Sequence, residues 1–89
     1  MSVDVEEIKK IISTLSKEEI LVLNYFIRNR SVGELLALRE LRGLHGIQEP
    51  MKIINKLVDK GLLEKGIGCY NISRNLIKMI KERKIVIKG

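Results

Sequence analysis

Residues 41–50 read LRGLHGIQEP, and this stretch decides the fold because one helix ends and another begins within it. Gly43 and Gly46 favour a turn, since glycine adopts positive φ angles without steric cost. Pro50 suits the first turn of a helix, where its missing N–H would lack a partner in any case. The sequence therefore predicts two helices joined by a turn. The second helix runs from Pro50 to about Lys60, and the glycine that follows can end it.

Two further helices are predicted at the start of the chain. Apolar residues spaced three or four positions apart indicate an amphipathic helix from Asp4 to about Thr14. Ser16 and Glu19 have the spacing of a capping box, in which each side chain bonds to the backbone N–H of the other residue. This box opens a second helix through residues 20–27 that is apolar on nearly every side. We therefore expect the second helix to lie buried at the centre of the molecule.

A third helix and its cap are predicted directly before the turn. Ser31 and Glu34 repeat the capping-box spacing and predict where this helix begins. Its apolar side is expected to carry three leucines: Leu35, Leu38 and Leu41.

The C-terminal third is predicted to form a hairpin, a last helix and an apolar tail. Segments 62–65 and 69–72 flank a glycine-containing turn and indicate a β-hairpin. Ser73 can cap a final helix that extends to about Lys84. The tail, residues 85–87, is β-prone, and it is expected to be a short strand, a partner contact or a frayed end.

The composition is that of one small folded domain. The chain has 89 residues, of which 45% are hydrophobic and 31% charged, which excludes a disordered chain and a cleft between two domains. Its single cysteine cannot form a disulfide within the chain, which excludes the secreted disulfide scaffolds. No apolar run approaches the ~18 residues of a membrane span, and no signal-peptide region opens the chain. We therefore expect a cytoplasmic protein.

Positive charge is concentrated in the last third of the chain. The net charge is +6, and residues 61–89 carry seven basic and two acidic side chains. This distribution suits contact with nucleic acid, an acidic protein or anionic lipid, although a lysine-rich soluble surface has the same composition. The 14 Ile, 11 Lys and nine Glu also favour a thermophilic source, and an AT-rich genome would raise Ile and Lys in the same way.

The order of the elements resembles the winged helix-turn-helix family of archaeal type over Ser16 to Ser73. Residues 41–47 look like the end of a positioning helix and its turn, with the usual glycine–aliphatic pair at Gly46-Ile47. The resemblance implies a mostly α-helical domain, 1–89, with a small β-hairpin wing and extra N- and C-terminal helices. Its parts would be an extra helix at 4–14, a core at 16–60, a wing at 62–72 and a C-terminal helix at 73–84.

Two polar surfaces are the candidate contacts. In the family the helix after the turn reads DNA, and on this helix the polar residues lie opposite the apolar ones. Four of them would contact bases or phosphates: Gln48, Lys52, Asn55 and Lys56. The last helix carries a basic ridge near the wing, and with the wing lysine it would grip phosphates: Arg74, Lys78, Lys81 and Lys65. An ordinary solvated surface is the alternative, because Glu49 and Asp59 offset the two lysines of the first surface.

These surfaces lead to two functional hypotheses. The first is a duplex DNA-binding winged helix, a small transcription regulator that dimerises through its N-terminal helix and apolar tail. The second is a winged helix that binds a protein, because the whole chain also resembles the small basic accessory subunit of archaeal B-family replicative DNA polymerase. Glu49, which phosphates would repel, and the apolar tail favour this second hypothesis, and the basic ridge would be the partner contact.

No enzyme, metal site or cofactor is expected. His45 is the sole histidine and Cys69 the sole cysteine, and they fall in different parts of the predicted fold, so we expect neither a two-histidine metal site nor a Cys–His nucleophile. Cys69 is expected to pack as a small hydrophobic residue. The last helix lacks aromatic anchors, so we expect no membrane-surface role.

Overall fold

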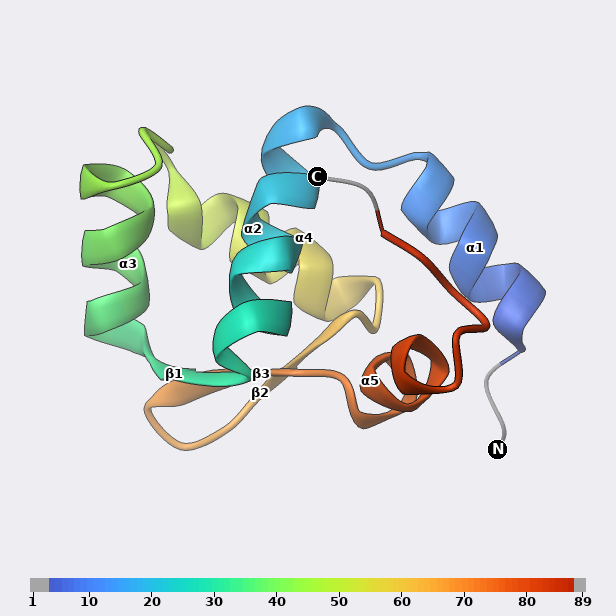
Figure 1. Ribbon diagram of the computed structural model, residues 1–89. Coiled ribbons are helices and arrows are strands. Elements are labelled where there is room, and N and C mark those ends of the chain that lie inside the picture. Colours follow the sequence, from blue (N-terminus) through green and yellow to red (C-terminus); the bar gives the residue numbers. More distant parts are fainter. Residues whose placement is uncertain (1–3, 88–89) are drawn as a thin grey trace.

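The computed structural model describes residues 4–87, and in this range five helices pack around a three-stranded antiparallel sheet (Figure 1). In chain order the elements are α1 (Val5–Ser13), α2 (Lys17–Asn29), β1 (Ser31–Gly33), α3 (Glu34–Gly43), α4 (Pro50–Asp59), β2 (Leu63–Lys65), β3 (Cys69–Ile72) and α5 (Arg74–Lys81). The predicted fold class, mostly helical with a small hairpin, is confirmed. The arrangement is compatible with a winged helix.

The helices α2, α4 and α5 begin at the residues that the capping patterns and Pro50 predict. The Ser16 N–H donates to Glu19 Oε1 at 2.9 Å and the Glu19 N–H donates to Ser16 Oγ at 3.2 Å, so the capping box is complete. Pro50 occupies the first turn of α4, and the Ser73 hydroxyl accepts from the Leu76 N–H at the start of α5. These contacts satisfy N–H groups that would otherwise lack partners at the helix ends.

The segment Ser31–Gly33 forms a strand, so the second capping box is wrong. It pairs antiparallel with β3 as the outer strand of a sheet ordered β1-β3-β2. The Ser31 hydroxyl contacts Asn71 Oδ1 at 2.5 Å instead of a helix N–H, and Val32 is buried. Gly33 stands at the N-cap of α3 with no side-chain cap. Burial of Val32 and the backbone pairing with β3 outweigh a local cap, because they satisfy several polar groups together.

The core-facing side of α3 differs from the predicted one. Leu35 is 79% exposed and Leu38 is half-buried, whereas Ala37 and Leu41 are completely buried. Residues four positions apart share one side of a helix, so Ala37 and Leu41 together define the side that faces the core. Leu35 stands two positions before Ala37 and so lies on a different side of the helix, where its side chain is exposed.

The last helix ends at Lys81, three residues earlier than predicted. Arg83 then adopts a positive φ of 59° and turns the chain back. The tail 85–87 is not a strand: it runs between α1 and α2, and Ile85 is 4% exposed within the core (Figure 1). Ile8 of α1 is equally buried. The two segments predicted as dimer surfaces therefore bury apolar side chains within the chain itself, and dimerisation stays a prediction.

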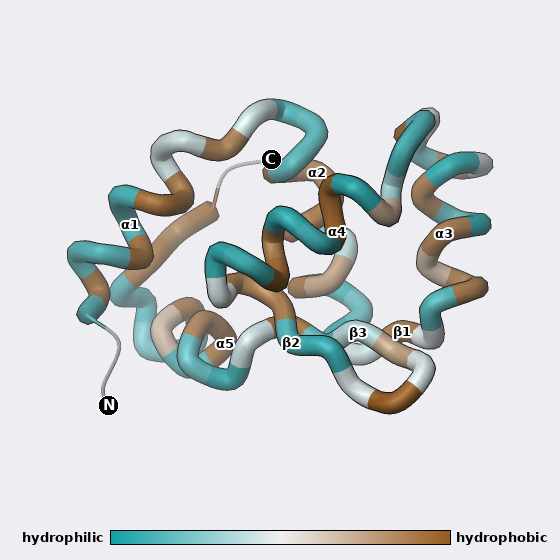
Figure 2. Tube along the Cα trace, turned by 180° about the vertical axis from the view of Figure 1, so that it is seen from behind, coloured by the Kyte–Doolittle hydropathy of each residue, from teal (hydrophilic) through white to brown (hydrophobic). Residues whose placement is uncertain are grey.

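When the molecule is seen from behind, α4 lies in front of α2, and part of its tube has the colour of hydrophilic residues (Figure 2). The front of the molecule carries α2 and the tail (Figure 1). In the range 4–87 no helix is long and apolar enough to cross a membrane.

Candidate interaction surfaces

The polar side of α4 is exposed as predicted. Four predicted contact residues lie on this side or directly before the helix, and all are exposed: Gln48, Lys52, Asn55 and Lys56. On the opposite side Ile54 and Leu57 are completely buried. The helix thus presents one polar surface to solvent, which we call the α4 face.

The α4 face carries nearly balanced charge. Lys52 Nζ lies 3.6 Å from a Glu49 carboxylate oxygen, and both side chains are largely exposed. A shallow hollow of about 350 Å³ at this face is lined by Glu18 and Glu49 as well as by Lys52 and Lys56. Phosphate attraction depends on excess positive charge, so two carboxylates beside two ammonium groups weaken it.

The basic ridge on α5 is less balanced. Its three members are exposed, and none forms an ion pair within residues 4–87: Arg74, Lys78 and Lys81. The Arg74 backbone N–H donates to a Glu64 carboxylate oxygen at 3.2 Å. Lys65 is exposed at the wing end of β2. The predicted site is therefore distributed over a nearly neutral α4 face, a basic α5 ridge and the wing.

The sequence analysis missed an apolar groove along α2. The sequence predicts a buried central helix that is apolar on nearly every side, but Ile20, Leu21 and Ile27 are half-buried and line an open cavity of about 700 Å³. The buried side of the helix consists of other residues: Val22, Leu23 and Phe26. The only sequence signal for the groove is that α2 has more apolar surface than one core-facing side requires.

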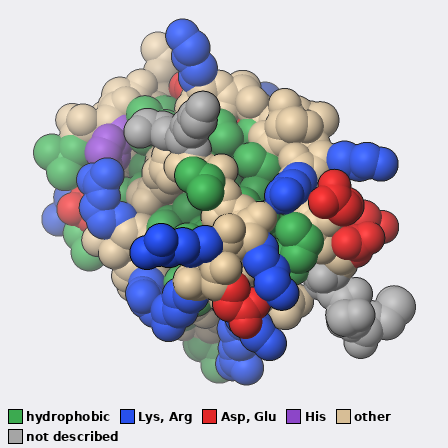
Figure 3. Space-filling view, turned by 45° about the vertical axis from the view of Figure 1, so that its right-hand side comes forward, with side chains coloured by type: hydrophobic (Ala, Val, Ile, Leu, Met, Phe, Trp, Pro, Cys, Tyr) green, Lys and Arg blue, Asp and Glu red, His purple; other side chains and the backbone are tan. Residues whose placement is uncertain are grey.

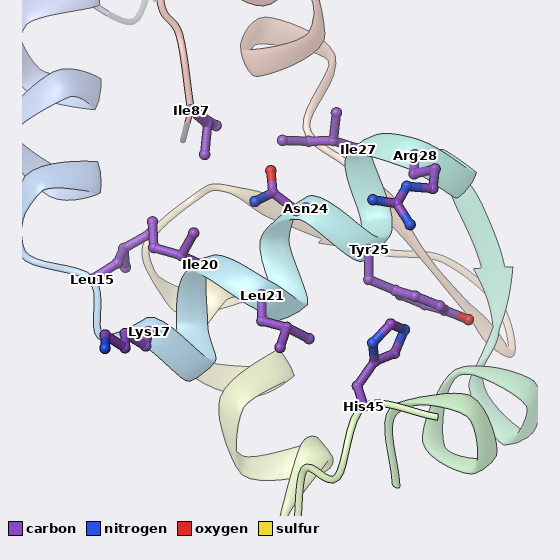
Figure 4. Close-up of a pocket in the computed structure, with 10 residues that line it drawn as sticks. All are labelled: Leu15, Lys17, Ile20, Leu21, Asn24, Tyr25, Ile27, Arg28, His45 and Ile87. Atoms are coloured by element: carbon purple, nitrogen blue, oxygen red, sulfur yellow. The ribbon is translucent and has the colours of Figure 1, made fainter. Parts of the chain in front are cut away.

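The groove is bounded by segments that are distant in the sequence. Leu15 lies at one end, and the rings of His45 and Tyr25 lie edge to face at the other, with centroids 5.9 Å apart (Figure 4). Ile87 of the tail lies above α2, where a second hollow of about 220 Å³ continues the groove. Figure 3 shows hydrophobic side chains exposed near the centre of a face that carries Lys and Arg side chains, with Asp and Glu side chains among them.

A buried tyrosine supports the His45 end of the groove. The Tyr25 hydroxyl donates to Glu40 Oε1 at 2.5 Å and so connects α2 to α3. Burial and then the Glu40 carboxylate raise the pKa of the Tyr25 phenol well above its ordinary value. Burial and the Glu34 carboxylate raise the pKa of Tyr70 in the same way. Both phenols therefore remain neutral hydrogen-bond donors at any physiological pH.

His45 and Cys69 lie in different parts of the described structure, His45 between α3 and α4 and Cys69 in β3. No group of three or more His, Cys, Asp or Glu side chains that could hold a metal ion occurs within residues 4–87. Cys69 is half-buried in β3, with its Sγ 3.9 Å from Asn71 Oδ1, whereas His45 packs on Tyr25.

One comparison with known families gives a match. The model of a family described as PolB1 Binding Protein 2 matches residues 16–78. This range begins at the capping box of α2 and ends within α5. It covers more than half of the 89-residue chain. No curated protein is similar enough to count as a match.

Proposed function

We propose that this chain, which belongs to the PolB1 Binding Protein 2 family, is a small accessory subunit that binds the DNA polymerase PolB1. The observation that carries the proposal is the family match over residues 16–78. It agrees with the resemblance to the small accessory subunit of archaeal B-family polymerase. A transcription regulator finds no comparable support, because the family is described by a polymerase partner.

The charge of the α4 face also favours a protein partner. A reader of the major groove needs donors and positive charge where the helix meets DNA. Here the Glu49–Lys52 ion pair and the carboxylate of Glu18 counter that charge. In this proposal the chain has no catalytic activity of its own, and it works in the cytoplasm beside the polymerase.

The proposal is tested by mixing the purified chain with purified PolB1 from the same organism and measuring the mass of the eluted species by light scattering. We expect a stable complex, with micromolar or tighter affinity by calorimetry at ~150 mM salt. A small unrelated protein of similar pI is the control for charge-driven association. Separate elution of chain and polymerase at micromolar concentrations would overturn the proposal.

DNA contact is the second candidate, and the basic ridge favours it. Arg74, Lys78 and Lys81 place positive charge on one side of α5 without an ion pair in the described range. A subunit of a polymerase could use this ridge to hold duplex DNA through its phosphates, without reading sequence.

Fluorescence anisotropy with mixed-sequence duplex DNA at ~50 and ~200 mM salt tests this candidate. We expect the Lys78→Ala/Lys81→Ala variant to bind more weakly and with a reduced salt slope. The matched Lys52→Ala/Lys56→Ala variant of the α4 face should change both quantities less. The reverse order would assign DNA contact to the α4 face, and no binding at low salt would exclude both surfaces.

A further inference from the structure

The groove along α2 is an open, largely apolar hollow of about 700 Å³. Its floor is formed by Ile20, Leu21 and Ile27, which lie on one side of α2 over two turns (Figure 4). Exposed concave apolar surface is unusual on a small domain, because it stabilises the fold only when something covers it. The tail covers part of it, since Ile87 lines both hollows, and about 700 Å³ remains open.

The charged residues that line the groove and the adjoining hollow are all basic. Lys17 and Arg28 line its two ends, and Arg83 lines the adjoining hollow. No Asp or Glu is among the described residues that line either hollow. Lys17 and Arg28 are eleven residues apart on α2, which corresponds to roughly 16 Å along the helix axis. An occupant that matches this pattern is apolar along its centre and acidic towards its ends.

A polar side chain in the middle of the floor adds a second requirement. Asn24 lies between Ile20 and Ile27 with its amide directed into the groove (Figure 4). Among the described residues, 4–87, the half-buried amide of Asn24 makes no side-chain hydrogen bond. Covering the groove with a purely apolar surface would leave the amide without a hydrogen-bond partner, which is unfavourable. The occupant must therefore offer a polar group near its centre.

The position of the groove leaves the α4 face free. Figure 1 shows α2 and the tail at the front, and Figure 2 shows the α4 face on the other side of the molecule. A segment seated on α2 would not cover the α4 face. The α4 face therefore stays exposed while the groove is occupied.

We propose that the groove binds an amphipathic helix of the PolB1 polymerase. This helix has about three turns, apolar residues at helical spacing with one polar residue among them, and carboxylates near both ends that meet Lys17 and Arg28. The inference rests on the proposed function, and it replaces the α5 ridge with the α2 groove as the polymerase contact.

Charge reversal tests the groove against the ridge with variants of equal net charge. Lys17→Glu/Arg28→Glu alters the two ends of the groove, and Lys78→Glu/Lys81→Glu alters the ridge; all four side chains are exposed, so both variants should fold. We expect affinity for purified PolB1, measured by calorimetry at ~150 mM salt, to fall at least about tenfold for the groove variant and less than about twofold for the ridge variant. Circular dichroism checks that each variant is folded.

Acetylation of the wild-type chain gives a measurement that needs no variant. With PolB1 bound, Lys17 should become protected from an amine-reactive reagent, while Lys78 stays reactive. If the wild-type chain does not bind PolB1, the proposed function fails. If it binds but the groove variant binds equally well and Lys17 stays reactive, the function stands and the groove proposal is overturned. If the wild-type chain dimerises without PolB1 and the groove variant does not, the groove binds a second copy of this chain instead.

Discussion

At the scale of single residues, Glu19 connects two parts of the fold that are distant in the sequence. One carboxylate oxygen accepts from the Ser16 N–H at 2.9 Å, and the other lies 3.4 Å from Lys60 Nζ at the end of α4. The side chain is 13% exposed, so these contacts are largely shielded from solvent. The Ser16 N–H is the main cause of a lowered pKa for Glu19, and Lys60 adds to it.

We predict that Glu19→Gln reduces the dependence of stability on acid. A carboxylate whose pKa is lower in the folded state stabilises the fold above its unfolded pKa, and this contribution is lost as the pH falls through the folded pKa. Glutamine keeps an acceptor oxygen but no charge, so the variant should be about 1 kcal/mol less stable at pH 7. Urea unfolding at pH 7 and pH 3 measures both effects. If the wild type and the variant lost the same amount of stability between pH 7 and pH 3, Glu19 would not be the source of the acid dependence.

The predictable contacts at this scale are those between neighbours in the sequence. The capping box joins Ser16 to Glu19, three positions away, so the spacing alone indicates it. The same spacing at Ser31 predicts a capping box that does not form, because the partner of the Ser31 hydroxyl is Asn71, forty positions later. A local pattern cannot show which of two contacts a side chain makes when the second arises only on folding.

At the scale of elements, the ends of α3 and α4 offer a matched pair of glycines. Gly61 follows α4 with a φ of +77°, whereas Gly43 ends α3 at an ordinary helical φ. A Cβ atom at either position would have no neighbour within 4 Å, so the backbone alone determines the effect. We predict that Gly61→Ala costs about 1–2 kcal/mol. Gly43→Ala should instead be neutral or add up to about 1 kcal/mol.

The urea midpoint measures both glycine variants, provided that the m-value is unchanged. A loss in both would indicate that the chain does not tolerate a side chain at the end of α3. No loss at Gly61 would mean that the loop after α4 can adopt another path.

Element boundaries followed from the sequence more closely than element surroundings. The starts of α2, α4 and α5 depend on caps and proline, which are local. The strand β1 and the core-facing side of α3 depend on pairing with β3 and on packing, which no window of sequence contains. The groove could not be predicted for the same reason. The sequence of α2 shows which of its residues are apolar, but it does not show which of them the neighbouring segments bury.

At the scale of the whole molecule, the tail is part of the core. Ile85 is 4% exposed, whereas its neighbour Val86 is 79% exposed. We predict that Ile85→Ala costs about 2–4 kcal/mol, because it removes buried methyl groups and leaves a cavity. Val86→Ala should stay within about 0.5 kcal/mol of the wild type. Thermal melting separates the two, and equal Tm values would show that the tail does not stabilise the fold.

The overall architecture was predictable because its five helices and hairpin each have a sequence signal. The charge balance of the predicted site was less predictable. Sequence spacing places Lys52 and Lys56 on one side of α4, but it does not place Glu18 of α2 beside them. Charge balance on a surface is a property of packed elements, so it became visible only with the structure.

The pairing of β1 with β3 also has a consequence for the order in which the molecule folds. The β2–β3 hairpin joins residues nine positions apart, at Leu63 and Ile72, whereas Ser31 lies opposite Asn71 across three intervening elements. Closing the longer loop costs about 1 kcal/mol more in chain entropy. The helices and the hairpin should therefore form early, and the docking of β1 should set the refolding rate.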